Sequence, residues 1–88
     1  MIVKTWLQKS TEVKDYTLDW TDELGTDTIS TSTWTVTSGI TKDSSSNTTK
    51  TATVWLSAAT AGSDHTATNT IVTTAGRTLV RAIVIEGY

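Results

Sequence analysis

The sequence contains one histidine, His65, and a hydrolytic site with a serine or threonine nucleophile would need this residue as its base. The chain holds 22 threonines and 9 serines, so a hydroxyl near His65 says little about catalysis. Neither a nucleophile elbow nor a glycine-rich oxyanion loop accompanies it. We therefore predict an ordinary strand residue at His65 and a protein with no catalytic residue. A hydrolase built on His65 is the outside alternative.

Five acidic residues lie close together in the first third of the chain: Asp15, Asp19, Asp22, Glu23 and Asp27. Carboxylates can bind Ca²⁺, but these lack the spaced Asp/Asn-Gly-Glu loop that makes a calcium site specific. Asp15 and Asp19 could be proposed as a glycosidase pair, yet 88 residues leave little room for a substrate cleft. The cluster favours a solvated face, so we predict neither a metal ion nor a cofactor.

Four tryptophans in so short a chain carry a large share of the possible burial. Trp20 and Trp34 fall on the apolar faces of their segments, which predicts core positions. The alternation around Trp6 and Trp55 is ambiguous, and an exposed tryptophan is a typical interface anchor. These two are the predicted contacts with a partner protein; a stacking platform for a sugar is the alternative.

Apolar residues recur with a period of two almost throughout, which predicts an all-β chain. The predicted strands cover residues 2–9, 13–20, 32–38, 51–57, 64–73 and 77–86. A short helical turn with a threonine cap and a glycine stop is expected at 21–25, and a hairpin with glycine at 74–76. The polar stretch 42–47 has nothing to bury and is expected to be a mobile connection at the tip of the molecule.

About seven short strands with turn signals near every tenth residue favour an immunoglobulin-like antiparallel β-sandwich, with a small barrel as runner-up. The predicted inward residues are Tyr16, Leu18, Trp20, Trp34, Val36, Ile71, Ile83 and Ile85. Ala52, Val54 and Leu56 share one face of their strand and Trp55 lies on the other, and either Leu56 or Trp55 is expected to be less buried than the other. The length predicts a single domain, 1–88. Because there is no cysteine, the core must hold this fold alone or with help from a partner.

The formal charge of −2 and the scattered lysines give no field that would attract nucleic acid. No segment approaches the length of about 20 apolar residues that a membrane helix needs, and no export signal opens the chain. We expect a soluble protein that binds neither nucleic acid nor membrane.

Several short motifs, taken together in order and spacing, resemble the fiber-tail adaptor proteins of tailed bacteriophages. They are Trp6-Leu7-Gln8-Lys9-Ser10, Asp15-Tyr16-Thr17-Leu18-Asp19-Trp20, Asp27-Thr28-Ile29 with Trp34, Thr68-Asn69-Thr70-Ile71 and Gly76-Arg77-Thr78. The resemblance covers most of the chain. It implies a non-enzymatic, immunoglobulin-like virion protein, assembled in the host cytoplasm, that joins a fibre or tailspike to the tail in many copies.

The resemblance also implies partners among the other virion proteins: tail tube, adaptor, fibre or tailspike. Two features depart from the family pattern, which often has an aromatic residue at the position of His65 and a less apolar last strand. A neighbouring subunit would cover both faces of that strand most simply, so Val80 and Val84 join Trp6 and Trp55 as predicted interface residues. A capsid decoration protein and a carbohydrate-binding module are the alternative functions.

Overall fold

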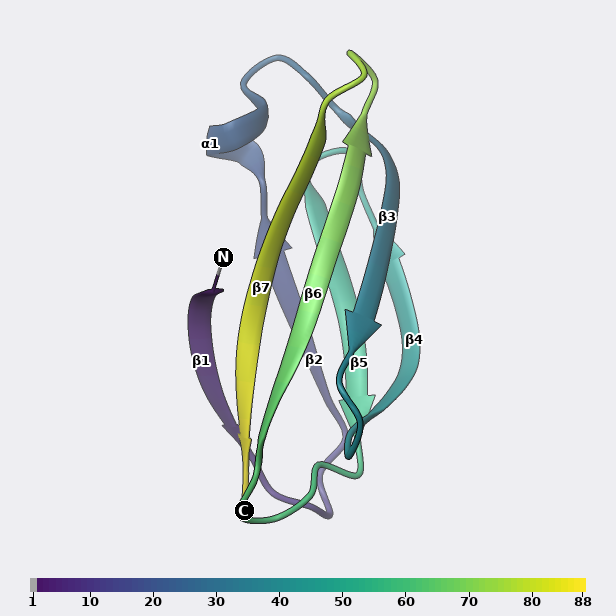
Figure 1. The fold of residues 1–88 in the computed structure, drawn as a ribbon. Helices are drawn as coiled ribbons and strands as arrows, with labels where there is room; N and C mark the ends of the chain where they lie inside the picture. Colours follow the sequence, from purple (N-terminus) through teal and green to yellow (C-terminus); the bar gives the residue numbers. More distant parts are fainter. Residues whose placement is uncertain (1) are drawn as a thin grey trace.

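The alternation of β-branched and polar residues produces seven strands and one helical turn, shown in Figure 1 by a computed structural model that describes residues 2–88. In chain order they are β1 (Ile2–Gln8), β2 (Lys14–Asp19), α1 (Thr21–Leu24), β3 (Ile29–Val36), β4 (Thr41–Asn47), β5 (Thr51–Ser57), β6 (Asp64–Thr73) and β7 (Thr78–Gly87). Within these residues, no helix has the length and apolar character needed to span a bilayer.

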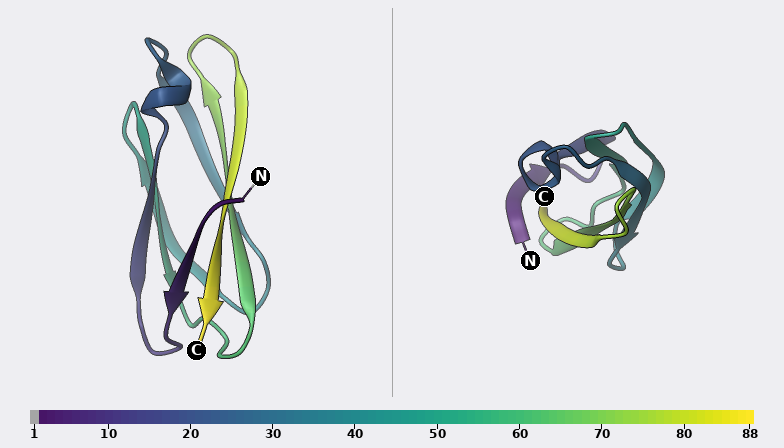
Figure 2. Two further views of the ribbon diagram at one scale, coloured as in Figure 1. Left: turned by 90° about the vertical axis from the view of Figure 1, so that its left-hand side faces the viewer. Right: turned by 90° about the horizontal axis from the view of Figure 1, so that it is seen from above.

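The strands form two sheets, one in the order β1-β7-β6-β3 and the other in the order β2-β5-β4. Figure 2 shows them as two facing layers that do not close into a barrel. The predicted immunoglobulin-like sandwich is therefore confirmed, and the alternative of a small barrel is wrong. The helical turn α1 and the β6–β7 hairpin lie at one end of the sandwich, and the C-terminus lies at the other (Figure 1).

One pairing departs from the predicted antiparallel arrangement, because β1 runs parallel to β7. The connection after β1 crosses from one sheet to the other, so β1 and β2 do not form a hairpin. The last strand, β7, runs in the same direction as β1 and pairs with it, so that β1 forms the edge of the sheet. This register places Trp6 opposite Ile85 and Leu7 opposite Glu86.

The space between the sheets is filled by the residues that the alternation predicts to point inward. Trp20 and Trp34 are each only 2% exposed, and both contribute to one continuous core. The other buried members of this core are Tyr16, Leu24, Ile29, Ile40, Ala52, Val54, Leu56, Ala59, Ala67, Ile71, Ile83 and Ile85. Leu18 and Val36 are half-buried against it. The inward faces were thus predicted correctly.

The polar stretch 42–47 is a strand and not the mobile tip that its composition predicted. It belongs to β4, which pairs antiparallel with β5 and is exposed along its whole length. An edge strand needs backbone hydrogen bonds on only one side and can leave every side chain in water, so the absence of apolar residues does not prevent it. Lys42 ties it to the opposite sheet by donating to the carbonyl of Trp34 at 3.0 Å.

The helical turn lies where the sequence predicts it, but its predicted threonine cap is wrong. The residue at the N-cap position of α1 is Trp20, whose side chain makes no capping hydrogen bond, and the N–H of Thr21 donates to the carboxylate of Asp19 at 2.9 Å. The hydroxyl of Thr21 donates instead to the carboxylate of Asp19 at 2.5 Å. The glycine stops are confirmed: Gly25 follows the turn with φ of +60°, and Gly76 closes the β6–β7 hairpin with φ of +92°.

Two buried amides connect the layers. The Nε2 of Gln8 donates to the carbonyls of Leu56 (2.9 Å) and Glu12 (2.8 Å), while its Oε1 accepts from the hydroxyl of Tyr16 (2.8 Å). In the other half of the interior, Asn69 accepts a hydrogen bond from the indole of Trp20 and donates to two groups on β3. Each amide thus joins one sheet to the other and fixes how they face.

Candidate interaction surface

The four-stranded sheet presents a broad outward face, referred to below as the outer face. Ile83 and Ile85 point into the core, so the alternating positions on β7 point away from it. Strand pairing extends this face over the neighbouring strands. Its threonines are Thr5, Thr31, Thr33, Thr35, Thr66, Thr68, Thr70 and Thr78. Its apolar residues are Ile2, Leu7, Val72, Val80, Ala82 and Val84.

The outer face is uncharged over most of its area and combines rows of threonine with apolar side chains. Leu7 is 60% exposed, Val80 41% and Val72 39%. Strands of 7, 8, 10 and 10 residues, with about 3.3 Å per residue and about 4.8 Å between strands, give a face of roughly 550 Å². A standard protein interface buries about 800 Å² per partner, so this face could supply most of one. The exposed aliphatic side chains on this face make it a candidate binding site for another protein.

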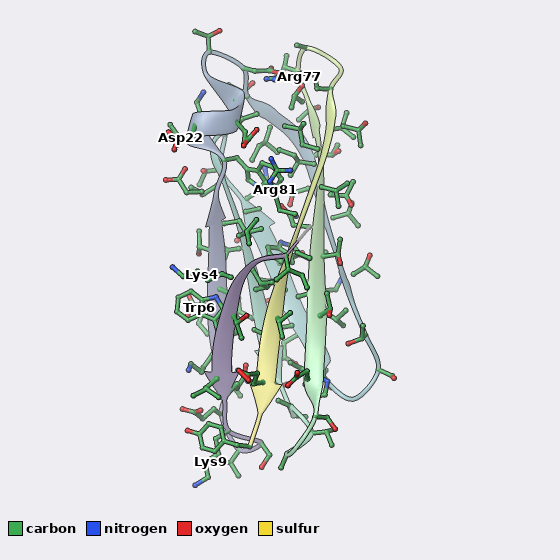
Figure 3. The ribbon with its side chains drawn as sticks, turned by 60° about the vertical axis from the view of Figure 1, so that its left-hand side comes forward. Lys4, Trp6, Lys9, Asp22, Arg77 and Arg81 are labelled. Atoms are coloured by element: carbon green, nitrogen blue, oxygen red, sulfur yellow. The ribbon has the colours of Figure 1, made fainter. Side chains whose placement is uncertain are left out.

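The four predicted interface residues do not form one patch. Val80 and Val84 share the outer face, whereas Trp55 points out of the opposite sheet, between Asp15 and Ser44 on the adjacent strands. Trp6 lies at the edge between the sheets, with its ring 5.7 Å from that of Tyr16. Figure 3 shows Trp6 there, next to the side chain of Lys4.

The outward face of the three-stranded sheet differs in chemistry from the outer face. It carries acidic side chains, among them Asp15 and Asp43, and hydroxyls that bond to one another, such as those of Thr17 and Thr53 at 2.9 Å. Trp55, 41% exposed, is its one large apolar residue. Because Trp6 and Trp55 lie on different parts of the molecule, they do not make a shared stacking platform.

The acidic residues of the first third are dispersed by the fold. Asp19 accepts hydrogen bonds from the hydroxyl and N–H of Thr21, which lower its pKa. Glu23 pairs with Arg81 at 3.0 Å. Asp15 lies four strand residues before Asp19, about 13 Å away and too far for a glycosidase pair. Among residues 2–88, no three metal-ligating side chains gather at one point.

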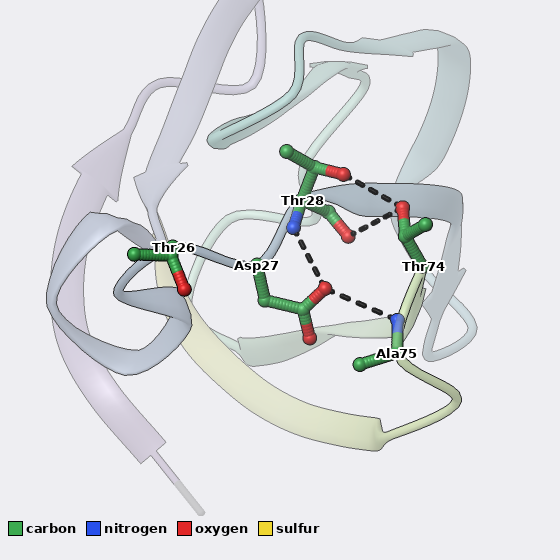
Figure 4. Close-up of a pocket in the computed structure, with 5 residues that line it drawn as sticks. All are labelled: Thr26, Asp27, Thr28, Thr74 and Ala75. Atoms are coloured by element: carbon green, nitrogen blue, oxygen red, sulfur yellow. Dashed lines mark hydrogen bonds between the residues drawn. The ribbon is translucent and has the colours of Figure 1, made fainter.

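Asp27 lines an open hollow at the end of the sandwich and binds the β6–β7 hairpin through hydrogen bonds (Figure 4). Its Oδ1 accepts from the N–H groups of Thr28 (2.8 Å) and Ala75 (3.1 Å), and its Oδ2 accepts from the guanidinium of Arg77 (3.1 Å). Arg77 also donates to the carbonyls of Glu23 and Leu24. These bonds occupy both carboxylate oxygens of Asp27. Asp27 therefore connects the loop after α1 to the β6–β7 hairpin, and neither oxygen is free for a ligand.

The hydrogen bonds of Asp27 make the stability of the fold depend on pH. Hydrogen bonding, first from the hydroxyl of Thr73 and then from Thr28, Arg77 and Ala75, lowers the pKa of Asp27 to about 2. The unfolded value is about 4, so Asp27 stabilises the fold above about pH 4 and loses this contribution as the pH falls to about 2. We expect Asp27→Asn to be less stable at neutral pH and to lose less stability below about pH 4. Urea midpoints measured across this range test it; parallel profiles for the two proteins would contradict it.

His65 lies in β6 and is 2% exposed, as an ordinary strand residue would be. Its Nε2 lies 3.1 Å from the backbone N of Thr60 and 3.3 Å from the carbonyl of the same residue. The Thr60 hydroxyl donates to the carbonyl of Gly39 at 2.8 Å. The imidazole therefore holds the turn before β6, and the geometry gives no support to the hydrolase alternative.

Residues 8–86 match the family described as "Podophage GP4 fiber-tail adaptor protein gp77". The chain belongs to this adaptor family. Among curated proteins, none matches it. The resemblance inferred from the motifs is confirmed, and the adaptor is thereby placed in a family of structural components of phage tails.

The motifs that carried the resemblance mark positions that brace the adaptor's fold. Trp20 and Asn69 share a hydrogen bond at 3.0 Å, Asp27 and Arg77 form an ion pair at 3.1 Å, and Gln8 joins the two sheets. The sequence did not predict these hydrogen bonds and this ion pair, because the partners lie far apart in the sequence. The motifs also contain three residues of the outer face: Leu7, Thr68 and Thr70.

Proposed function

We propose that this chain is a non-enzymatic virion protein that joins a fibre or tailspike to the tail, through protein–protein contacts and in many copies. The family match over residues 8–86 carries this proposal. The outer face supports it, because an adaptor must present a surface that binds another protein and this face carries the exposed side chains of Leu7, Val72 and Val80. The experiment is deletion of the gene from the phage. Virions should then lack fibres, and supplying the protein should restore them; fibres that attach without it would refute the proposal.

The outer face is the proposed contact, and a charge placed at its centre should abolish it. We expect Val80→Asp with Val84→Asp to weaken binding to the tail or the fibre by at least about a hundredfold, since two carboxylates would be desolvated without partners. Cosedimentation with purified tails and fibres measures this. The control, Ser44→Asp with Ser46→Asp, places two charges on exposed positions of β4 in the other sheet and should bind normally. Equal loss in both variants would contradict the assignment.

Trp55 supports a second candidate, because it is a single exposed aromatic ring beside an acidic and hydroxyl-rich surface. A carbohydrate-binding module could stack a sugar on this ring. Trp55→Ala would then abolish a fluorescence response to glycans while leaving tail and fibre binding intact. Mass spectrometry of separated tails and heads distinguishes the adaptor from a capsid decoration protein.

A further inference from the structure

The edge of the four-stranded sheet at β1 differs from the other sheet edges. The two sheets end at four strands, β1 and β3 in one sheet and β2 and β4 in the other. Three of the six residues of β2 are charged, and β4 carries only polar side chains. Lys42 of β4 also donates to the carbonyl of Trp34 on β3. Charged and polar side chains of this kind keep an edge strand from pairing with another chain.

β1 lacks this protection. Its one charged residue is Lys4. Its four large apolar residues are all exposed: Ile2, Val3, Trp6 and Leu7. Figure 1 shows β1 at the margin of the sandwich, and Figure 3 shows Trp6 and Lys4 there. An exposed edge strand with apolar side chains favours pairing with a strand of another chain.

The backbone of β1 offers hydrogen bonds on the side away from β7. The carbonyl of Gln8 accepts from the N–H of Tyr88 at 3.1 Å, which continues the ladder toward β7. The carbonyl of Leu7 faces the other way, because it accepts from the ammonium of Lys14 on β2 at 3.1 Å. Backbone groups alternate in direction along a strand, so those of Thr5 point the same way as those of Leu7. Within residues 2–88, no strand occupies the position they face.

The shape of β1 determines how an identical strand can pair with it. A bulge between Ile2 and Lys4 interrupts the register with β7, so residues 4–8 form the regular part of the strand, centred on Trp6. When two copies of this part run antiparallel, Thr5 of each copy pairs with Leu7 of the other through their free backbone groups. The two Trp6 residues then lie directly opposite each other.

The charges near this edge are compatible with such a pairing. The two Lys4 side chains lie four residues apart along the strands, a separation of about 13 Å. The Trp6 ring lies 5.7 Å from that of Tyr16, so these residues are at the same level of the two sheets. A two-fold axis at that level places Asp15 of β2 across from Thr17 of the other copy. No like charges are therefore brought face to face on β1 or β2, an arrangement that would destabilise the contact.

We propose that a second copy of this chain docks on β1, with the two β1 strands antiparallel about a two-fold axis beside Trp6. The two four-stranded sheets then form one continuous sheet of eight strands. Such a contact uses the same surface on both copies and closes at the dimer. The two Trp6 rings, flanked by Tyr16 of each copy, form an aromatic cluster at its centre.

The dimer would also join the two outer faces into one surface. A single outer face of roughly 550 Å² is smaller than the area of about 800 Å² that a standard interface buries per partner. Two joined faces offer about 1,100 Å², which exceeds it. This consequence rests on the proposed adaptor function, whereas the pairing of β1 goes beyond that function and does not depend on it.

The first test is disulfide crosslinking of Trp6→Cys, with Trp55→Cys as the matched control. Both variants replace an exposed tryptophan, and the chain has no other cysteine. Opposed residues of a non-hydrogen-bonded pair have Cα atoms about 4.5 Å apart, a separation that a disulfide can bridge. Under mild oxidation of the purified protein at high micromolar concentration, Trp6→Cys should give mainly linked dimer and Trp55→Cys only traces. Equal crosslinking of the two variants would overturn the inference.

The second test is Thr5→Pro, which removes an N–H from the free side of β1 and leaves the ladder with β7 intact. Sedimentation equilibrium of the unaltered protein should show a dimer, and Thr5→Pro should raise its dissociation constant at least about tenfold. The same change should prevent crosslinking in the Trp6→Cys background. Circular dichroism of both proteins should be alike.

An unaltered protein that stays monomeric at every concentration would refute the dimer. If added tails or fibres then slowed hydrogen exchange in β1, the edge would belong to a strand of another protein, and the inference would equally be wrong. Both tests use the isolated protein, so their failure is distinguishable from failure of the adaptor function, which deletion of the gene reveals.

Discussion

Trp34→Ala will lower the free energy of unfolding by about 4 kcal/mol, which is a large part of the stability expected for so small a domain. Trp34 is 2% exposed, so the truncation leaves a cavity between the sheets that the surrounding side chains only partly fill. Urea unfolding followed by circular dichroism measures the loss.

Trp55→Ala is the matched control, since it removes the same side chain from a position that is 41% exposed. We expect it to cost less than about 1 kcal/mol. Comparable losses for the two variants would show that the core is not centred between the sheets as described. The indole N–H of Trp34 has no hydrogen-bond partner, so Trp34→Phe should cost much less than Trp34→Ala.

The second large effect is expected at Gln8, where Gln8→Leu will cost about 3 kcal/mol. The substitution leaves the hydroxyl of Tyr16 without its acceptor and the buried carbonyl of Leu56 without the amide donor. β1 should also detach more easily from the rest of the sandwich, because this amide anchors its end. Faster hydrogen exchange in β1 is the local measurement, and urea unfolding gives the overall cost.

A double-mutant cycle with Tyr16→Phe isolates the hydrogen bond itself. Because Tyr16 and Gln8 contact each other directly, their effects should not add, and the coupling should be about 1 kcal/mol. Asn47→Leu serves as the control, since that exposed amide bonds only to the carbonyl of Thr48. Strictly additive effects at Gln8 and Tyr16 would contradict the assigned role.

We expect different residues of this protein to determine its stability and its binding to a partner. Interior side chains such as Trp34 and Gln8 hold the two sheets together, whereas the outer face around Val80 contributes little to the core. Variants of the outer face should therefore lose binding while keeping their melting temperature. The distinction lets an assembly defect be told apart from a folding defect.

The sequence alone determined six of the seven strands, their inward faces and the family. A period of two assigns each residue to one side of its strand whatever the strand pairs with, so Trp20, Trp34 and Ile85 could be placed in the core without knowing the topology. Turn residues such as Gly76 marked the strand ends for a similarly local reason.

Only the tertiary structure decided what depends on pairing between distant segments. β4 was missed because an edge strand can be held by backbone bonds and needs no apolar side chain. The division of Trp55 and Val80 between opposite faces followed from which sheet each strand joined. The place of β1 at a free sheet edge followed from its pairing with β7 at the other end of the chain, and neither segment's own pattern encodes that pairing.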